Sequence, residues 1–187
     1  MSFRSVTKSL TLACSLVVAM EAWSGDLAPI SRAKLLGHWQ EFSFPPETTQ
    51  RFQLRTTVPF DCQYLHFRDD GAIDKMSIVF GSQGGVCPKS DEVRKAFQGR
   101  SASLPEATKF RFIEHPSGNS LIAAAGQDQP QGQAVWLLMH VEQDMPWNGV
   151  QLRTGDLLMF LWLKTQDSPV KPIIFARWLR PLAEAPR

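Results

Sequence analysis

The sequence predicts an all-β fold, an antiparallel barrel of about eight strands with one short helix, and a β-sandwich is the alternative architecture. Two observations predict it: apolar segments of strand length recur along the chain, and turn-forming residues separate them. Eight strands also suffice for a closed barrel to fill itself with side chains or to hold one small ligand. The expected strands, by residue number, are 35–44, 51–58, the hairpin 64–80, 109–115, 120–125, 134–142, 156–164 and 172–180.

Residues 64–80 form the clearest hairpin of the sequence. Leu65 and Phe67 alternate with polar neighbours before the turn, and the alternation resumes after it. Asp70-Gly71 supplies the turn, because a two-residue hairpin loop needs backbone with positive φ. Further turns are expected at Pro116–Asn119, Asn148-Gly149 and Thr154-Gly155.

One helix is expected, over residues 91–98. Ser90 can cap its N-terminus, and Gly99 ends it. Val93 and Phe97 stand at positions i and i+4, so they share one face of the helix. That face predicts packing against the sheet.

Residues 1–24 have the layout of a secretory signal peptide, with Arg4 and Lys8 ahead of the apolar run 10–20 and small residues after it. The run is shorter than the ~20 apolar residues that a membrane-spanning helix needs. We therefore expect residues 1–24 to be removed. Residues 25–187 are then expected to form a single domain, periplasmic or secreted, with no membrane span.

The cysteine content predicts one disulfide. Of the three cysteines, Cys14 lies in the segment expected to be removed, so Cys62 and Cys87 remain in an oxidising compartment. A bridge between them would stabilise the fold by roughly 3–4 kcal/mol in the chain-entropy model. A two-cysteine metal site is the alternative, and it has little support because no histidine stands at zinc-finger spacing.

The charge of the chain argues against a nucleic-acid partner. The formal net charge is +2, and it falls to +1 when Arg4, Lys8 and Glu21 leave with the signal peptide. The basic residues are scattered, so the basic face that binds phosphate backbones is missing.

Gly37-x-Trp39 stands at the start of the first expected strand, after a short turn-like segment, and Arg177 and Arg180 lie in the last strand. This arrangement resembles the calycin superfamily of lipocalin-like and avidin-like β-barrels. The resemblance implies that Trp39 closes one end of the barrel and that Arg177 or Arg180 lies across its ring. Such a cation–π contact contributes ~1–2 kcal/mol when it is partly desolvated. An ordinary core tryptophan in an unrelated sandwich is the alternative.

Strands 134–142 and 156–164 are apolar on both alternating faces. A barrel with a wet exterior would show cleaner alternation, so something is expected to cover their outer side. The candidates are the helix 91–98, the N-terminal segment, or a second copy of the protein in a homodimer.

Two binding functions are consistent with these observations. The first is a small apolar molecule bound in the barrel mouth among Trp136, Phe160 and Trp162. The second is a protein partner, because the chain resembles in plan the bacterial periplasmic inhibitors of secreted metalloproteases. The resemblance rests on Gly37-x-Trp39, on the pair Cys62 and Cys87, and on the short lead 25–34, and it implies an N-terminal tail that enters a protease cleft. The chain is longer than these inhibitors, and its N-terminal tail lacks the small Ser-Leu start that the resemblance would imply.

Soft metal ligands occur close together as Met139, His140 and Met145, a set that could bind copper. Neighbouring residues of a strand point to opposite faces, so Met139 and His140 are not expected to bind one ion. The better interpretation is that the methionines are apolar packing residues beside a surface histidine. We expect no metal and no cofactor.

Residue types suited to acid–base chemistry occur as Glu114-His115 and as His66 near Asp69-Asp70. Both sets stand at ends of expected strands, where solvated polar residues are common. Ser31-x-x-Lys34 matches a serine–lysine nucleophile motif by letters, but its companion Ser-Asp-Asn and Lys-Thr-Gly elements are missing from the sequence. We therefore expect no enzymatic activity.

Overall fold

The computed structural model describes residues 26–52, 54–55, 61–80, 84–100, 108–125, 133–147, 149–165 and 168–183. The expected signal peptide, residues 1–24, lies outside these ranges. None of the helices in these ranges is long and apolar enough to cross a membrane.

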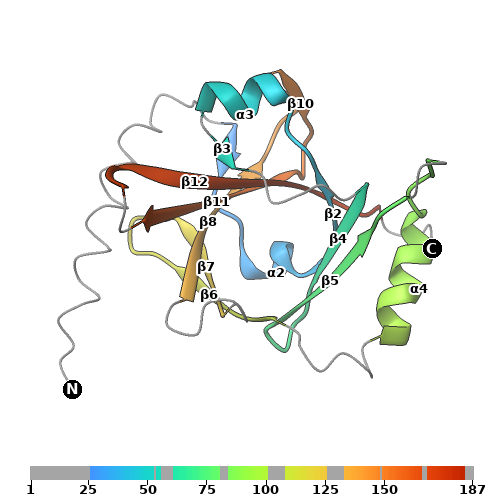
Figure 1. The fold of residues 1–187 in the computed structure, drawn as a ribbon. Helices are drawn as coiled ribbons and strands as arrows, with labels where there is room; N and C mark the ends of the chain where they lie inside the picture. Colours follow the sequence, from blue (N-terminus) through green and yellow to red (C-terminus); the bar gives the residue numbers. More distant parts are fainter. Residues whose placement is uncertain are drawn as a thin grey trace.

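Eight strands form a closed antiparallel barrel (Figure 1). Each strand pairs with the next one along the chain, and the last pairs with the first. The predicted fold class is confirmed. In chain order the barrel strands are β2 (Gly37–Phe42), β4 (Cys62–Phe67), β5 (Ala72–Ile78), β6 (Thr108–Glu114), β7 (Ser120–Ala125), β8 (Gln133–Val141), β11 (Leu157–Thr165) and β12 (Ser168–Pro181).

The expected strand 51–58 is not a barrel strand. Helix α3 (Pro46–Phe52) occupies its start, and Pro46 suits the first turn of a helix because its missing N–H is not needed there. The short strand β3 (Leu54–Arg55) then pairs in parallel with β12. Residues 53 and 56–58 of the predicted strand lie outside the described ranges. The other small elements are β1 (Leu27–Ala28), α2 (Arg32–Leu35), α4 (Ser90–Arg100), β9 (Met145–Trp147) and β10 (Val150–Leu152).

One end of the barrel is closed by the N-terminal segment, and α2 lies across it (Figure 1). Trp39 packs there and donates a hydrogen bond from Nε1 to the carbonyl of Leu35 at 2.9 Å. Ser120 Oγ donates to the carbonyl of Ile30 at 2.6 Å. Gly37 enters β2 with φ of +129°, a conformation that side chains disfavour, which accounts for glycine ahead of Trp39.

The barrel interior next to α2 is filled with apolar side chains. Strand registers decide which residues contribute, since alternate residues face inward. The filling cluster consists of Ile30, Leu35, Trp39, Leu65, Phe67, Phe110, Ile122, Leu138, Leu157, Met159 and Leu179.

The predicted cover over the outer faces of β8 and β11 is confirmed, but most of it comes from an element that the sequence marks only as a turn. The β9–β10 hairpin lies on these strands, and Leu27 of β1 packs at the edge. Helix α4, one of the predicted covers, lies over β4 and β5 instead. The buried cluster under the hairpin consists of Phe44, Leu137, Val141, Trp147, Val150, Leu152, Leu158, Phe160, Ala176 and Trp178.

The predicted helix and disulfide are both present. Val93 and Phe97 of α4 are buried against the outer face of β4 and β5. A disulfide joins Cys62, the first residue of β4, to Cys87, just before α4, with their Cα atoms 5.8 Å apart. It ties the start of this helix segment to the barrel.

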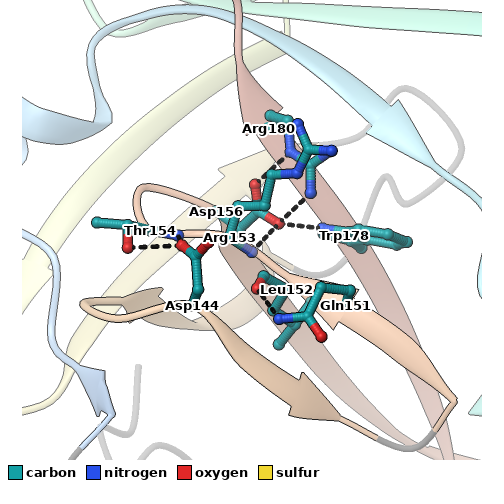
Figure 2. A network of polar contacts seen from close by, with 8 residues as sticks. All are labelled: Asp144, Gln151, Leu152, Arg153, Thr154, Asp156, Trp178 and Arg180. Atoms are coloured by element: carbon teal, nitrogen blue, oxygen red, sulfur yellow. Dashed lines mark hydrogen bonds and ion pairs between the residues drawn. The ribbon is translucent and has the colours of Figure 1, made fainter.

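A buried carboxylate fastens the turn before β11 to β12 (Figure 2). Asp156 is 0% exposed and accepts hydrogen bonds from Trp178 Nε1 at 2.8 Å and from the backbone N–H of Arg153 at 3.0 Å. It also accepts from Arg180 Nε at 2.7 Å and Nη2 at 2.8 Å. This bidentate ion pair, in which Asp156 is fully buried and Arg180 is partly buried, lies at the edge of the outer apolar cluster.

Candidate functional site

A polar cluster interrupts the apolar interior of the barrel. It consists of Glu41, Gln63, Lys75 and Arg177, from the neighbouring strands β2, β4, β5 and β12. Glu41 pairs across the strands with Gln63 on one side and with Leu179 on the other. Arg177 stands two residues before Leu179 on the same strand, so it points to the same face as Leu179. Lys75 is the cross-strand partner of the inward residue Leu65. All four positions therefore face inward, on the side of the barrel away from α2, and the Lys75 side chain is exposed there.

The carboxylate of Glu41 is the centre of the cluster. Gln63 Nε2 donates a hydrogen bond to Glu41 Oε2 at 2.7 Å, and Arg177 Nη1 lies 3.5 Å from the same oxygen. The Glu41 side chain is 5% exposed, so the ion pair is largely desolvated.

Two buried atoms of this cluster have no hydrogen-bond partner among the described residues. They are Arg177 Nε, a donor, and Gln63 Oε1, an acceptor. Buried polar atoms are almost always satisfied by protein, water or a bound molecule, because an unpaired one costs about 1–3 kcal/mol. These two atoms thus offer one donor and one acceptor inside the barrel.

An aromatic wall stands beside the charged groups. The guanidinium carbon of Arg177 lies 5.3 Å from the ring centroid of Trp136, within cation–π range. Trp136 is half-buried and packs, together with Phe112, on the apolar filling of the barrel. The site is apolar on one side and charged on the other.

The electrostatics of the cluster favour a negative partner. Burial lowers the pKa of Lys75, and the positive charge of Arg177 lowers it further, while Glu41 raises it. The positive charge of Arg177 disfavours the protonated form of Lys75. An anion bound between them would stabilise both the Lys75 ammonium and the Arg177 guanidinium.

A depression in the surface reaches this cluster from the rim where β2 ends and β4 begins. It touches both Glu41 and Gln63, the two most buried members. Its lining residues are Gln40, Glu41, Phe42, Ser43, Asp61, Gln63 and Cys87.

The three predicted ligand-binding residues do not lie together. Trp136 faces the interior, as expected. Phe160 belongs to the outer cluster under the β9–β10 hairpin, because Leu161 is the residue that pairs with Trp136 and shares its face. The placement of Phe160 in the barrel mouth was therefore wrong. The side chain of Trp162 lies outside the described part of the structure, and its backbone pairs with Ile174.

The predicted stacking of Arg177 or Arg180 on Trp39 is also wrong. Pro181 is the cross-strand partner of Trp39, so Arg177 lies four residues farther along the barrel and reaches Trp136. Arg180 points to the outer face, where its guanidinium lies 5.0 Å from the Phe42 ring and 5.4 Å from that of Trp178.

Of the residues considered for metal binding, the two methionines have packing contacts, whereas the buried Nδ1 of His140 has no hydrogen-bond partner among the described residues. Met139 and Met145 pack on the outer apolar cluster, and His140, next to Met139, faces the other way. Among the residues that the structure describes, no group of three or more His, Cys, Asp or Glu side chains could hold a metal ion.

The residues considered for catalysis occupy turns and a helix start. Ser31 Oγ caps α2 by accepting from the N–H of Lys34 at 3.4 Å. His115 Nδ1 lies 2.7 Å from Ser117 Oγ within an exposed turn. His66 differs from these, because its ring stacks on His38 beneath α4.

The fold and its interior define a closed antiparallel barrel with a charged and aromatic lining on one side. Comparison of the chain with protein-family models, with curated proteins and with solved structures gives no match. The function is therefore inferred from the geometry of the residues themselves.

Proposed function

We propose that the protein is a binding protein without catalytic activity, and that its barrel takes a small amphipathic molecule with an anionic group. One observation carries the proposal: inside the barrel, Arg177 lies over Trp136 while its buried Nε has no hydrogen-bond partner among the described residues. A cation held on an aromatic wall fits a ligand that has a negative end and an apolar body.

Each residue of the site has a separate role. The guanidinium of Arg177 pairs with the anionic group, and Lys75 adds a second positive charge. Gln63 Oε1 accepts a hydrogen bond from a donor on the ligand. Trp136 contacts the apolar body. Because the space next to α2 is filled by core side chains, the ligand has to be small.

Export and a calycin-like role belong to the same proposal. The Cys62–Cys87 disulfide supports an oxidising compartment, as does the signal-like layout of residues 1–24. The closed barrel supports the calycin resemblance at the level of architecture. We propose a periplasmic or secreted location.

The alternative of a protease-inhibitor-like partner has less support. That plan needs an N-terminal tail that reaches into another protein. Here β1 pairs with β8, and Ile30 and Leu35 are buried in the closed end of the barrel. The described part of the tail is therefore occupied within its own chain.

Replacing Arg177 with methionine should weaken binding of an anionic amphipathic probe. Decanoate and 1-decanol share an apolar chain and differ in charge, so the pair separates the two contributions. We expect Arg177→Met to reduce decanoate affinity about 10- to 100-fold, the effect of losing a charged hydrogen bond, and to change decanol affinity less than about threefold. Isothermal titration calorimetry measures both.

Arg111→Met is the matched control, because Arg111 is exposed on the outer face of β6. It should leave both affinities unchanged. Equal losses in the two variants, or a wild-type protein that binds neither compound, would contradict the proposed site.

A further inference from the structure

A second group of titratable side chains lies on the outer face of the barrel, outside the proposed ligand site. His38, His66 and Asp74 are direct cross-strand neighbours on β2, β4 and β5. The two imidazole rings stack with their centroids 3.9 Å apart and their planes 8° from parallel. We call these three residues the histidine row.

Helix α4 covers part of the histidine row, and the His66 side chain remains 23% exposed. The ring of Phe97 lies 5.4 Å from the His38 ring and 5.6 Å from the His66 ring. Phe97 itself is buried. From the same helix, Arg94 donates from Nη2 to the carbonyl of Leu182 at 3.1 Å and also to that of Ala183. The helix therefore rests on the two rings and is held at one side by the C-terminal segment.

The acidic member of the row is buried and poorly satisfied. Asp74 is 2% exposed, and its Oδ2 lies 3.5 Å from His66 Nδ1 and 3.6 Å from Arg68 Nη1. Neither Asp74 oxygen has a hydrogen-bond partner among the described residues, and the same holds for His66 Nδ1 and His38 Nε2.

The charged groups around the rings come from three sides. Asp74 and Arg68 lie on the barrel side, and Asp70, which pairs with Arg68 at 2.7 Å, stands in the β4–β5 turn. Arg94 faces His38 from α4. A first proton on His66 can pair with Asp74. Arg94 is itself paired with the exposed Asp91 of α4 at 3.2 Å. A second proton, on His38, therefore meets the charge of a protonated His66 directly, together with Arg94, while the nearby carboxylate Asp74 is already approached by Arg68.

We propose that the histidine row is an acid-sensitive latch: neutral, stacked rings hold α4 on the barrel, and protonation of both rings releases the helix. Two charged imidazoles at stacking distance repel each other, and a charged ring loses its hydration beneath Phe97. Both effects weaken when the helix moves away, because water then hydrates the rings and screens the repulsion between them.

The titration of the two histidines agrees with this geometry. Burial lowers the pKa of His38 from 6.5 to about 4, with further lowering by His66 and Arg94 and an opposing effect of Asp74. Burial also lowers the pKa of His66, against the charge of Asp74. A histidine whose pKa is lower when α4 is packed than when α4 is released favours the packed helix at pH values above 6.5, the ordinary pKa of histidine. That stabilisation is lost as the pH falls from 6.5 toward about 4.

The covalent structure lets α4 move without unfolding the barrel. The Cys62–Cys87 disulfide keeps the start of the helix segment attached to β4. The connection that contains α4 joins β5 to β6, and the described residues of these two strands pair as Ala72 with Lys109 and Ile73 with Thr108. Release of the helix would therefore act first on the boundary between these two strands.

Hydrogen–deuterium exchange of the full chain at pH 7.5 and pH 5 tests the latch, with rates corrected for the intrinsic effect of pH. In the wild type we expect protection of residues 91–99 to fall at least about tenfold at the lower pH, while strands β8 and β11 keep theirs. His38→Phe preserves an aromatic ring under Phe97 that cannot be charged. Its helix should stay protected at both pH values.

His140→Asn is the matched control, because burial also lowers the pKa of His140, on the inner face of β8. It should release α4 as the wild type does. Unchanged protection in the wild type at pH 5, or equal loss in His38→Phe, would overturn the proposal. If His38→Phe does not fold, proton NMR of the wild type decides: imidazole signals that titrate while α4 stays protected would also overturn it.

Discussion

Replacing Asp156 with alanine is expected to lower the free energy of unfolding by about 3–5 kcal/mol, because it leaves the partly buried Arg180 guanidinium without its partner. Arg180 makes two hydrogen bonds to this carboxylate, and Trp178 Nε1 makes a third. The Asp156 side chain is fully buried, so little water can replace the lost oxygens. A loss of this size is a large fraction of the 5–15 kcal/mol that a domain typically has.

Urea unfolding followed by tryptophan fluorescence measures the effect. The matched control is Asp144→Ala on the same side of the barrel, because Asp144 is exposed and accepts hydrogen bonds only from the N–H and hydroxyl of Thr154 among the described contacts (Figure 2). Its loss should cost less than about 1 kcal/mol. Equal costs for the two variants would mean that the Arg180 contact adds nothing to stability.

Local patterns were sufficient to predict most of the barrel. The hairpin 64–80 was predicted because alternation and Asp70-Gly71 are both short-range signals, and Gly71 does have φ of +77°. Helix α4 was predicted because the pair Val93 and Phe97 and the expected end signals lie within one segment. The predicted ends were too narrow, since the helix spans Ser90–Arg100 and so contains both Ser90 and Gly99. The β9–β10 hairpin was missed since its strands have three residues each, too few to show a period.

The candidate site depended on long-range register, which local patterns do not contain. Strands β8 and β11 are apolar on both faces, so nothing in their sequence separates Trp136, which faces inward, from Phe160, which faces outward. One signal was present for the polar cluster. Glu41 stands two residues after Trp39 and therefore shares its face, so an inward Trp39 implies an inward Glu41.

The predicted contact of Arg177 or Arg180 with Trp39 failed for a related reason. The contact required the pairing of the first and last barrel strands, which are separated by most of the chain. A shift of one residue in that register moves a side chain to the opposite face. The buried Asp156, which binds Arg180, lies in a turn where an acidic residue is expected to be solvated.

Replacing Trp39 with alanine is expected to cost about 3–5 kcal/mol of unfolding free energy, the range observed when a large buried aromatic side chain is truncated. Trp39 is 3% exposed within the cluster that fills the closed end of the barrel. Its loss opens a cavity beneath α2 and leaves the carbonyl of Leu35 without its side-chain donor. Trp39→Phe keeps most of the ring volume and loses the hydrogen bond, so it should cost about 1–2 kcal/mol.

Trp136→Ala separates this structural role from the proposed binding role. Trp136 is half-buried on the same interior, but it lies at the charged side of the barrel beneath Arg177. Urea unfolding should therefore show a smaller loss of stability for Trp136→Ala than for Trp39→Ala. Decanoate affinity should fall more for Trp136→Ala than for Trp39→Ala, because the folded fraction of Trp39→Ala retains the Arg177 site. A Trp136→Ala variant as unstable as Trp39→Ala, with unaltered binding, would mean that both tryptophans only fill the core.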